Sequence, residues 1–115
     1  MKTDRERSKE RLLHILEAAE KIGTFTVGMT EPVFMKNEQT QGAVLFQFSI
    51  IGEAIAHVDT GILEKHSYPW HQARAFRNII AHEYFGIRME KVWSIVRYDL
   101  PELKRRVKEV LAKEF

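Results

Sequence analysis

The chain has 115 residues, of which 44% are hydrophobic and 30% charged. That balance excludes a disordered chain, and the length predicts a single domain over residues 1–115 with one hydrophobic core. The net charge of +2 is too small to predict nucleic-acid binding by itself, and the lack of cysteine excludes disulfides, thiolate zinc sites and thiol nucleophiles.

No stretch of the sequence resembles a membrane span or a secretory signal. The longest unbroken apolar run covers residues 43–46, far short of the roughly 20 residues that cross a bilayer. The first ten residues are dense in charge and lack the apolar stretch that a signal peptide requires. We therefore expect no membrane association and a cytoplasmic location.

The first predicted helix starts behind a capping box formed by Thr3 and Glu6. It ends between residues 24 and 28, and its apolar residues recur at spacings of three and four. These are Leu12, Ile15, Ala19 and Ile22. Residues 24–41 mix glycine, proline and polar residues, which predicts a loop with one short turn that starts at Thr30.

A second long helix is predicted from about Asn37 to Val58. A seven-residue apolar repeat runs through it, formed by Val44, Phe48, Ile51, Ile55 and Val58. Residues 59–61 should stop this helix, and an irregular stretch should follow as far as His66.

The third predicted helix has Ser67 or Tyr68 as its cap and Pro69 in its first turn. Its apolar residues are Trp70, Ala73, Phe76 and Ile80. Gly86 is placed to end the helix in the left-handed conformation that glycine tolerates, with residues 82–85 as the last turn.

A short fourth helix carries Val92, Trp93 and Val96, and residues 99–102 then cap a final helix. Leu103, Val107 and Val110 of that helix should point inward. Since no strand pattern or internal repeat occurs, the sequence predicts an all-α, antiparallel, up-and-down helical bundle.

Arg77, His82 and Tyr84 place a guanidinium, an imidazole and a phenol within eight residues. A guanidinium can hold a phosphate by two hydrogen bonds, and a histidine can give or take a proton at physiological pH. If RNA is the substrate, its own 2'-hydroxyl can act as the nucleophile, so that no metal or cofactor is needed. The residues suit phosphodiester cleavage.

Helix geometry limits how these residues can meet. Residues seven apart share a helical face, whereas residues five apart are separated by about 140°. Arg77 and Tyr84 would align and His82 would not. Convergence therefore needs either a distorted last turn near Gly86 or a second copy of the helix across a two-fold axis, and we favour a homodimer. The alternative is a core helix on which Arg77 is paired internally, His82 caps carbonyls and Tyr84 packs.

The sequence resembles the HepT-like ribonucleases of the HEPN superfamily over nearly its whole length. The family signature, Arg, a polar residue, three more residues and His-x-Tyr, is met by Arg77, Asn78 and residues 82–84. Residues 52–54, Trp70 and residues 99–103 also resemble the family pattern.

The resemblance implies a metal-independent RNA endonuclease that acts as a homodimeric toxin of a type VII-like toxin–antitoxin pair. Arg77 and His82 would be catalytic, and Asn78 and Tyr84 would support them. A nucleotidyltransferase antitoxin would silence the toxin by attaching adenylate to Tyr84, where bulk and negative charge block phosphate binding.

Two other hypotheses remain. The chain could be a catalytically inactive HEPN module that binds a nucleotidyltransferase or nucleotide, or a helical DNA-binding regulator, although no helix pair with a basic recognition face stands out.

Further charged groups in the sequence have plainer interpretations. The basic residues near both ends are interleaved with acidic residues, a pattern that predicts solvent-exposed helix faces. His57, His66 and His71 lack the spacing of a metal site. Glu53 either pairs with Arg77 across the bundle, which would orient the site, or faces solvent.

Overall fold

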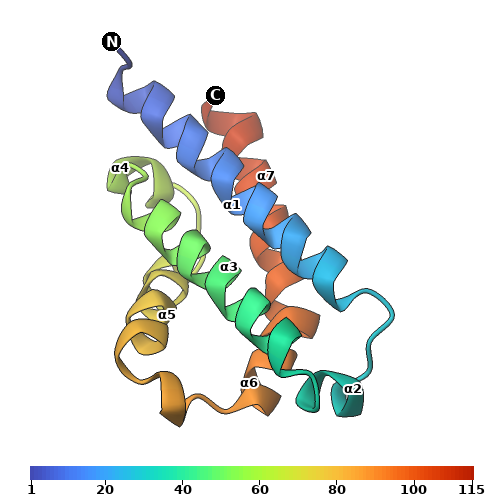
Figure 1. Cartoon of the computed structure of the whole chain (residues 1–115). Helices are drawn as coiled ribbons and strands as arrows, with labels where there is room; N and C mark the ends of the chain where they lie inside the picture. Colours follow the sequence, from blue (N-terminus) through green and yellow to red (C-terminus); the bar gives the residue numbers. More distant parts are fainter.

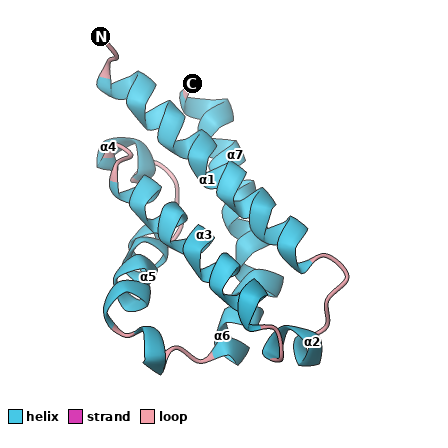
Figure 2. Ribbon diagram, viewed as in Figure 1, coloured by secondary structure: helices cyan, strands magenta, loops and turns pink.

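The computed structural model describes all 115 residues and is entirely helical (Figures 1 and 2). In chain order the elements are α1 (Asp4–Thr26), α2 (Glu31–Met35), α3 (Glu38–Ala56), α4 (Thr60–Leu63), α5 (Trp70–His82), the 3-10 turn η1 (Tyr84–Gly86), α6 (Met89–Ser94), the π-helical segment η2 (Ile95–Asp99) and α7 (Leu100–Glu114). The prediction of an all-α chain is therefore confirmed.

The first three helices begin directly after the residues that the sequence suggests as their caps. Thr3 accepts from the backbone N–H of Glu6 while the Glu6 carboxylate accepts from that of Thr3, so the predicted capping box is present. Asn37 accepts from the N–H of Thr40 at the start of α3, and Thr30 occupies the cap position of α2. The predicted bounds of these helices are right within about two residues.

The long helices alternate in direction around one core. Figure 1 shows α1 and α5 running one way and α3 and α7 the other, with α3 between α1 and α5. All 23 buried hydrophobic residues form a single cluster, including Leu12, Ile15, Phe34 and Val107, none of which is exposed at all. The rings of Phe34 and Trp93 lie 5.1 Å apart and tie α2 to α6. The antiparallel bundle is thus confirmed for one copy of the chain.

Two helix boundaries around the motif were predicted wrongly. Pro69 is the cap residue of α5 itself, and no side chain caps this helix. At the other end α5 stops at His82, because Glu83 leaves the helical region with φ −131° and ψ 33°. Gly86 lies in η1 and does not have a positive φ, which Gly28 alone adopts, at 75°. The expected left-handed stop at Gly86 and a last turn over 82–85 are therefore incorrect.

Two shorter segments also differ from the expectation. The stretch after α3 contains a helical turn, α4, in which the N–H of Gly61 donates a hydrogen bond to the carboxylate of the cap residue Asp59. Near residue 99 the helix widens instead of breaking, and the N–H of Leu100 bonds to the carbonyl of Ile95. Pro101 has no N–H and would clash with the carbonyl of Arg97 in a regular α-helix, so the wider π turn accommodates it.

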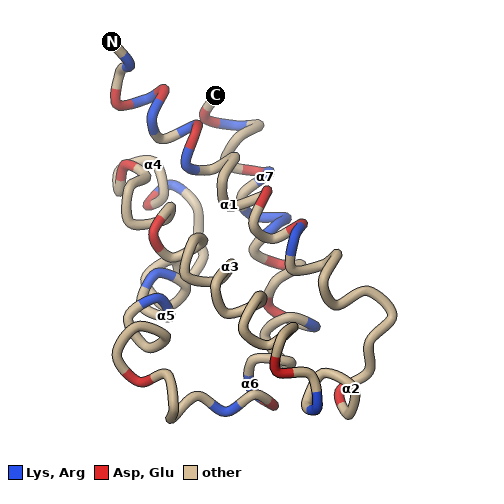
Figure 3. Tube along the Cα trace, viewed as in Figure 1, with Lys and Arg blue, Asp and Glu red and all other residues tan.

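No helix is both long and apolar enough to cross a membrane. Figure 3 shows basic and acidic residues alternating along α1 and α7, as the solvated-face interpretation expects. By contrast, α3 has no charged residue between Glu38 and Glu53. Glu53 is therefore the one acidic side chain in the C-terminal half of the central helix.

Candidate functional site

Helix α5 carries the motif residues and packs on α3 at a very close approach. A Cβ built on Gly52 would lie 2.7 Å from the Cβ of Arg77 and 3.0 Å from the carbonyl oxygen of Arg74. Both distances are shorter than van der Waals contact allows, so only glycine fits there. Gly52 thus lets the backbones of α3 and α5 approach each other closely at Arg77.

Arg77 forms an ion pair with Glu53, the residue after this glycine. Nη1 of Arg77 contacts the Glu53 carboxylate, and the two side chains are 40% and 44% exposed. The alternative in which Glu53 and Arg77 pair across the bundle is therefore correct. The contact uses one guanidinium nitrogen, which leaves Nε and Nη2 as donors for a phosphate.

His57 extends this pair along α3. Its Nδ1 lies 2.9 Å from the carbonyl oxygen of Glu53 and 3.5 Å from the carboxylate. The imidazole therefore borders the same carboxylate as Arg77, one helical turn further along. Glu53 is held between two groups that can carry positive charge, which fixes its place beside α5.

His82 occupies the last position of α5 and lies on a different side of the helix from the residues that face α3. Ala73, Phe76, Arg77 and Ile80 form the half-buried and buried stripe that faces α3. His82 lies about 200° around the helix from Ile80 and is exposed. Along the axis it is about 7.5 Å from Arg77. One copy of the chain therefore does not bring the imidazole and the guanidinium to a common point.

Asn78 and Tyr84 are also exposed. Tyr84 lies in the turn η1, so the helical alignment of Arg77 with Tyr84 does not hold. The Tyr84 ring is 45% exposed and meets the ring of Phe85 edge-on at 5.7 Å, while Phe85 is completely exposed. The turn thus presents two aromatic rings and a phenol to solvent beside the end of α5.

A cleft of about 830 Å³ separates α5 from the α6–α7 arm. Phe48, Phe76, Ile79, Ile95 and Leu103 are among its lining residues, and the rings of Phe48 and Phe76 lie 5.4 Å apart. Ile79 is 41% exposed in this copy. Helix α5 is therefore covered by α3 along one side and open along another, where apolar side chains face the cleft.

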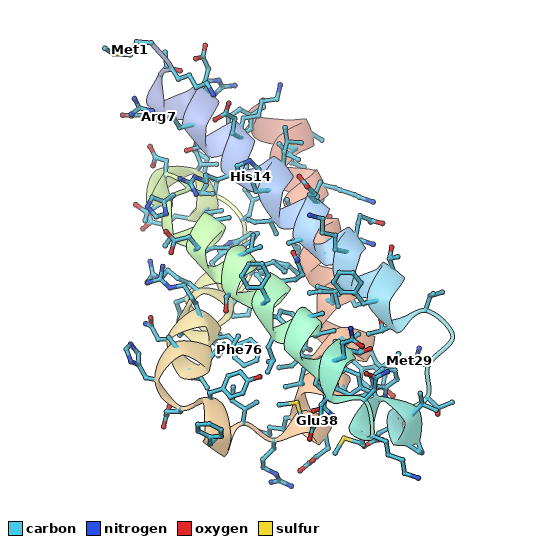
Figure 4. The ribbon with its side chains drawn as sticks, viewed as in Figure 1. Met1, Arg7, His14, Met29, Glu38 and Phe76 are labelled. Carbon is cyan, nitrogen blue, oxygen red and sulfur yellow. The ribbon has the colours of Figure 1, made fainter.

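A second, smaller groove of about 280 Å³ crosses the outer face of α3. It is lined by Arg11 and His14 of α1, by residues 49, 50, 53 and 54 of α3, and by Arg77. Figure 4 shows His14 midway along α1, beside the C-terminal half of α3. The sequence pattern assigned no site to Arg11 and did not single out His14. Their spacing of three on the flank of the apolar stripe is the signal that could have done so.

Away from α5, one polar contact ties α7 to the segment before α5. Nε2 of His66 lies 2.9 Å from Glu114 Oε2, and this hydrogen bond holds the pKa of Glu114 below its ordinary value of 4.5. Burial raises the pKa of the Tyr68 phenol in the same region. These contacts belong to the fold and not to the motif, and no group of three or more His, Asp or Glu side chains gathers in a metal-binding arrangement.

Comparison with known proteins identifies the family. The family model described as "Ribonuclease HepT-like" matches residues 15–110, which is most of the chain. The chain therefore belongs to the HepT-like ribonuclease family, and the resemblance noted in its sequence is confirmed.

Three relatives differ in how much of their length this chain covers. A candidate RNase of Caldanaerobacter subterraneus is 35% identical over 90% of this chain and 93% of its own length. The probable ribonuclease HepT of Thermococcus cleftensis is 32% identical over 89% of this chain and 94% of its own length. In Methanocaldococcus jannaschii, a protein named as a γ-glutamylcyclotransferase and candidate RNase is 35% identical over 87% of this chain, which spans only 46% of that longer protein. No solved structure matches the chain significantly.

Proposed function

We propose that this chain is a metal-independent RNA endonuclease in which Arg77 holds the scissile phosphate and His82 transfers protons. The observation that carries the proposal is the placement of Arg77 by Gly52 and Glu53, on the same helix that ends in an exposed histidine. The family and the ribonuclease names of its relatives point to RNA as the substrate class.

The proposed reaction is an internal transfer of the phosphoryl group. A base takes the proton of the 2'-hydroxyl, the 2'-oxygen attacks phosphorus, and the bond from phosphorus to the 5'-oxygen breaks as that oxygen receives a proton. The products are a 2',3'-cyclic phosphate and a 5'-hydroxyl. Arg77 offsets the charge that grows on the phosphoryl oxygens, and Asn78 helps to orient the phosphate. His82 supplies the proton transfers.

We further propose that the working enzyme is a homodimer. His82 lies on the side of α5 opposite Ile80, so a partner is needed to bring an imidazole to Arg77. The open side of α5 and the 830 Å³ cleft with its apolar lining give a second copy a surface to cover. In such a dimer the His82 of one copy serves the Arg77 of the other.

Tyr84 is the proposed site of regulation by a nucleotidyltransferase antitoxin. Its ring is 45% exposed in a turn next to His82, where a second enzyme can reach the phenol oxygen. Adenylate attached there would place bulk and negative charge beside the phosphate site. Incubation of the chain with its nucleotidyltransferase and ATP should add adenylate mass to wild type and not to Tyr84→Phe.

The first test is cleavage of a mixed RNA pool in EDTA, after mass spectrometry has excluded a modified Tyr84. We expect cutting that leaves cyclic-phosphate ends and that is lost in Arg77→Ala and His82→Ala. Arg74→Ala and His71→Ala remove the same residue types from exposed positions of α5 and should cut normally. Loss of all cutting on addition of EDTA would contradict the metal-independent mechanism.

Mixing the two inactive variants tests the shared site. In a dimer of Arg77→Ala with His82→Ala, one of the two sites regains both intact residues. Since half of the dimers formed on mixing are of this kind, activity should return to about a quarter of the wild-type value. A site built within one copy would give no recovery.

The competing hypothesis is an inactive HEPN module that binds a nucleotidyltransferase. The pairing of Arg77 with Glu53 favours it, because a guanidinium that already has a carboxylate partner binds phosphate less strongly. Failure of the unmodified dimer to cut diverse RNAs would support this hypothesis.

A further inference from the structure

The groove across the outer face of α3 combines three cationic or ionisable side chains from two helices. Arg11 and His14 come from α1 and Arg77 from α5, and the 280 Å³ between them is floored by α3. Glu53 is the only acidic side chain in its lining, and Arg77 already pairs with it. The groove therefore keeps an excess of positive charge close to the residue that we propose holds the scissile phosphate.

Arg11 is the cation in this groove without an ionic partner. None of the ion pairs in the structure includes it, whereas its neighbour Arg7 lies 3.6 Å from Asp4. The acid nearest in sequence, Glu10, is held by the ammonium of Lys2. Arg11 is also half-buried. Its planar guanidinium presents its donors in a fixed fork, so less side-chain entropy is lost for each hydrogen bond that it forms to an anion.

His14 lies one turn further along α1 and is exposed at the same groove. The spacing of three residues places it on the same face as Arg11. Ser49 adds a hydroxyl from α3, which donates to the carbonyl of Leu45 at 3.3 Å and can still accept. The set of donors suits the non-bridging oxygens of a phosphodiester and not an apolar ligand.

We propose that Arg11 and His14 bind a backbone phosphate of the RNA next to the phosphate held by Arg77, so that the substrate strand crosses α3 through this groove. This inference rests on the proposed function, because it assumes that Arg77 faces the scissile phosphate. Arg11 and His14 are positioning residues in this arrangement: they hold the strand and take no part in bond breaking.

The experiment measures the binding of a fluorescent, 2'-O-methylated RNA oligonucleotide, which lacks the nucleophile and cannot be cleaved by the proposed route. Arg11→Gln should weaken binding by about tenfold near physiological salt. It should also lower the slope of log Kd against log salt by about 0.7, the value for one phosphate contact on a single strand. His14→Ala should weaken binding by a smaller factor, roughly two- to fourfold.

Two further variants serve as controls. Arg11→Lys keeps the charge and should retain the salt slope of wild type. Lys9→Gln removes one positive charge from an exposed position of α1 outside the groove, and it should change Kd by less than about twofold. In cleavage assays Arg11→Gln should raise KM with little change in kcat, which separates strand binding from chemistry. Circular dichroism and thermal unfolding verify that each variant is folded.

The outcomes separate the two proposals. Equal weakening by Arg11→Gln and Lys9→Gln, or a normal Kd for Arg11→Gln alongside a weakened Arg77→Ala, would overturn the groove while leaving the ribonuclease proposal standing. If wild type does not bind the oligonucleotide at all, both proposals fail together. Weakening by Arg11→Gln with wild-type binding intact supports the groove even if the protein does not cut RNA.

Discussion

Helices α1 and α3 differ from helix α5 in how much of each helix is buried. The first two bury seven of 23 and eight of 19 residues, whereas α5 buries only Trp70 and Ile80 out of 13. Every residue of the proposed catalytic set lies on α5 or on the turn after it. Stability and the candidate chemistry are therefore carried by separate parts of this bundle, which meet at the contact between Gly52 and Arg77.

The largest expected effect is the loss of stability when a core residue of α1, away from the proposed catalytic residues, is truncated. Ile15→Ala removes a fully buried side chain and should lower the free energy of unfolding by about 2–5 kcal/mol, measured by urea denaturation. His82→Ala changes an exposed residue and should shift that free energy by less than about 0.5 kcal/mol while abolishing cleavage. The separation of roles fails if His82→Ala unfolds the chain as readily as Ile15→Ala.

The second effect acts where the two parts meet. Gly52→Ala places a methyl group 2.7 Å from the Cβ of Arg77, and forcing the helices apart should cost roughly 1–3 kcal/mol of stability and displace the guanidinium. Gly42→Ala, on the same helix with nothing within 4 Å, should instead stabilise the chain by up to about 1 kcal/mol. Thermal unfolding and cleavage rates of both variants measure the contrast, and matched behaviour of the two would show that the close approach is unimportant.

A smaller effect separates placement from stability. In Glu53→Gln the carboxylate that holds Arg77 is lost, so kcat/KM should fall about tenfold, which is about 1.4 kcal/mol of transition-state stabilisation. The exposed pair should contribute less than about 1 kcal/mol to folding. Glu38→Gln, which changes the other acid of α3, should cut RNA at the wild-type rate. Faster cleavage by Glu53→Gln would mean that Glu53 restrains Arg77 instead of placing it.

The smallest effect lies far from α5 and depends on pH. Because His66 lowers the pKa of Glu114 in the folded chain, this interaction stabilises the fold above about pH 4.5 and is lost as the pH falls below it. Glu114→Gln should therefore lower Tm by a few degrees at pH 7, and the difference from wild type should close in acid. Glu64→Gln, an exposed acid without an ionic partner, should show no such pH dependence. A Tm difference that persists at low pH would mean that packing, and not charge, is responsible.

What the sequence predicts well is set by local side chains. The side chains of Thr3 and Asn37 each accept a hydrogen bond from a backbone N–H three residues ahead, and Thr30 occupies the cap position of α2 without such a bond, so the capping pattern alone locates the starts of three helices. The apolar repeats likewise mark the faces of α1 and α3 that are buried. These features depend on neighbours along the chain and not on the fold.

The errors occur where a helix ending depends on more distant contacts. Gly86 permits a left-handed stop but does not require one, and the chain leaves the helix at Glu83 instead. The pairing of Glu53 with Arg77 was one of two open alternatives, because only the packing of α3 on α5 decides between them. The groove that contains Arg11 and His14 was missed for the same reason: it exists only where three helices meet.

The widened turn over residues 95–99 has a consequence for changes in chain length. A π turn holds about one residue more than a regular turn, so the extra residue is taken up locally and the helices on either side keep their apolar faces toward the core. A deletion of one residue within this segment should therefore be tolerated, provided that Pro101 is also replaced. The same deletion in the middle of α1 would rotate every later position of that helix by about 100° and turn its buried stripe toward solvent. Once Pro101 is replaced, this segment is a place where the chain can lose a residue without a change of fold.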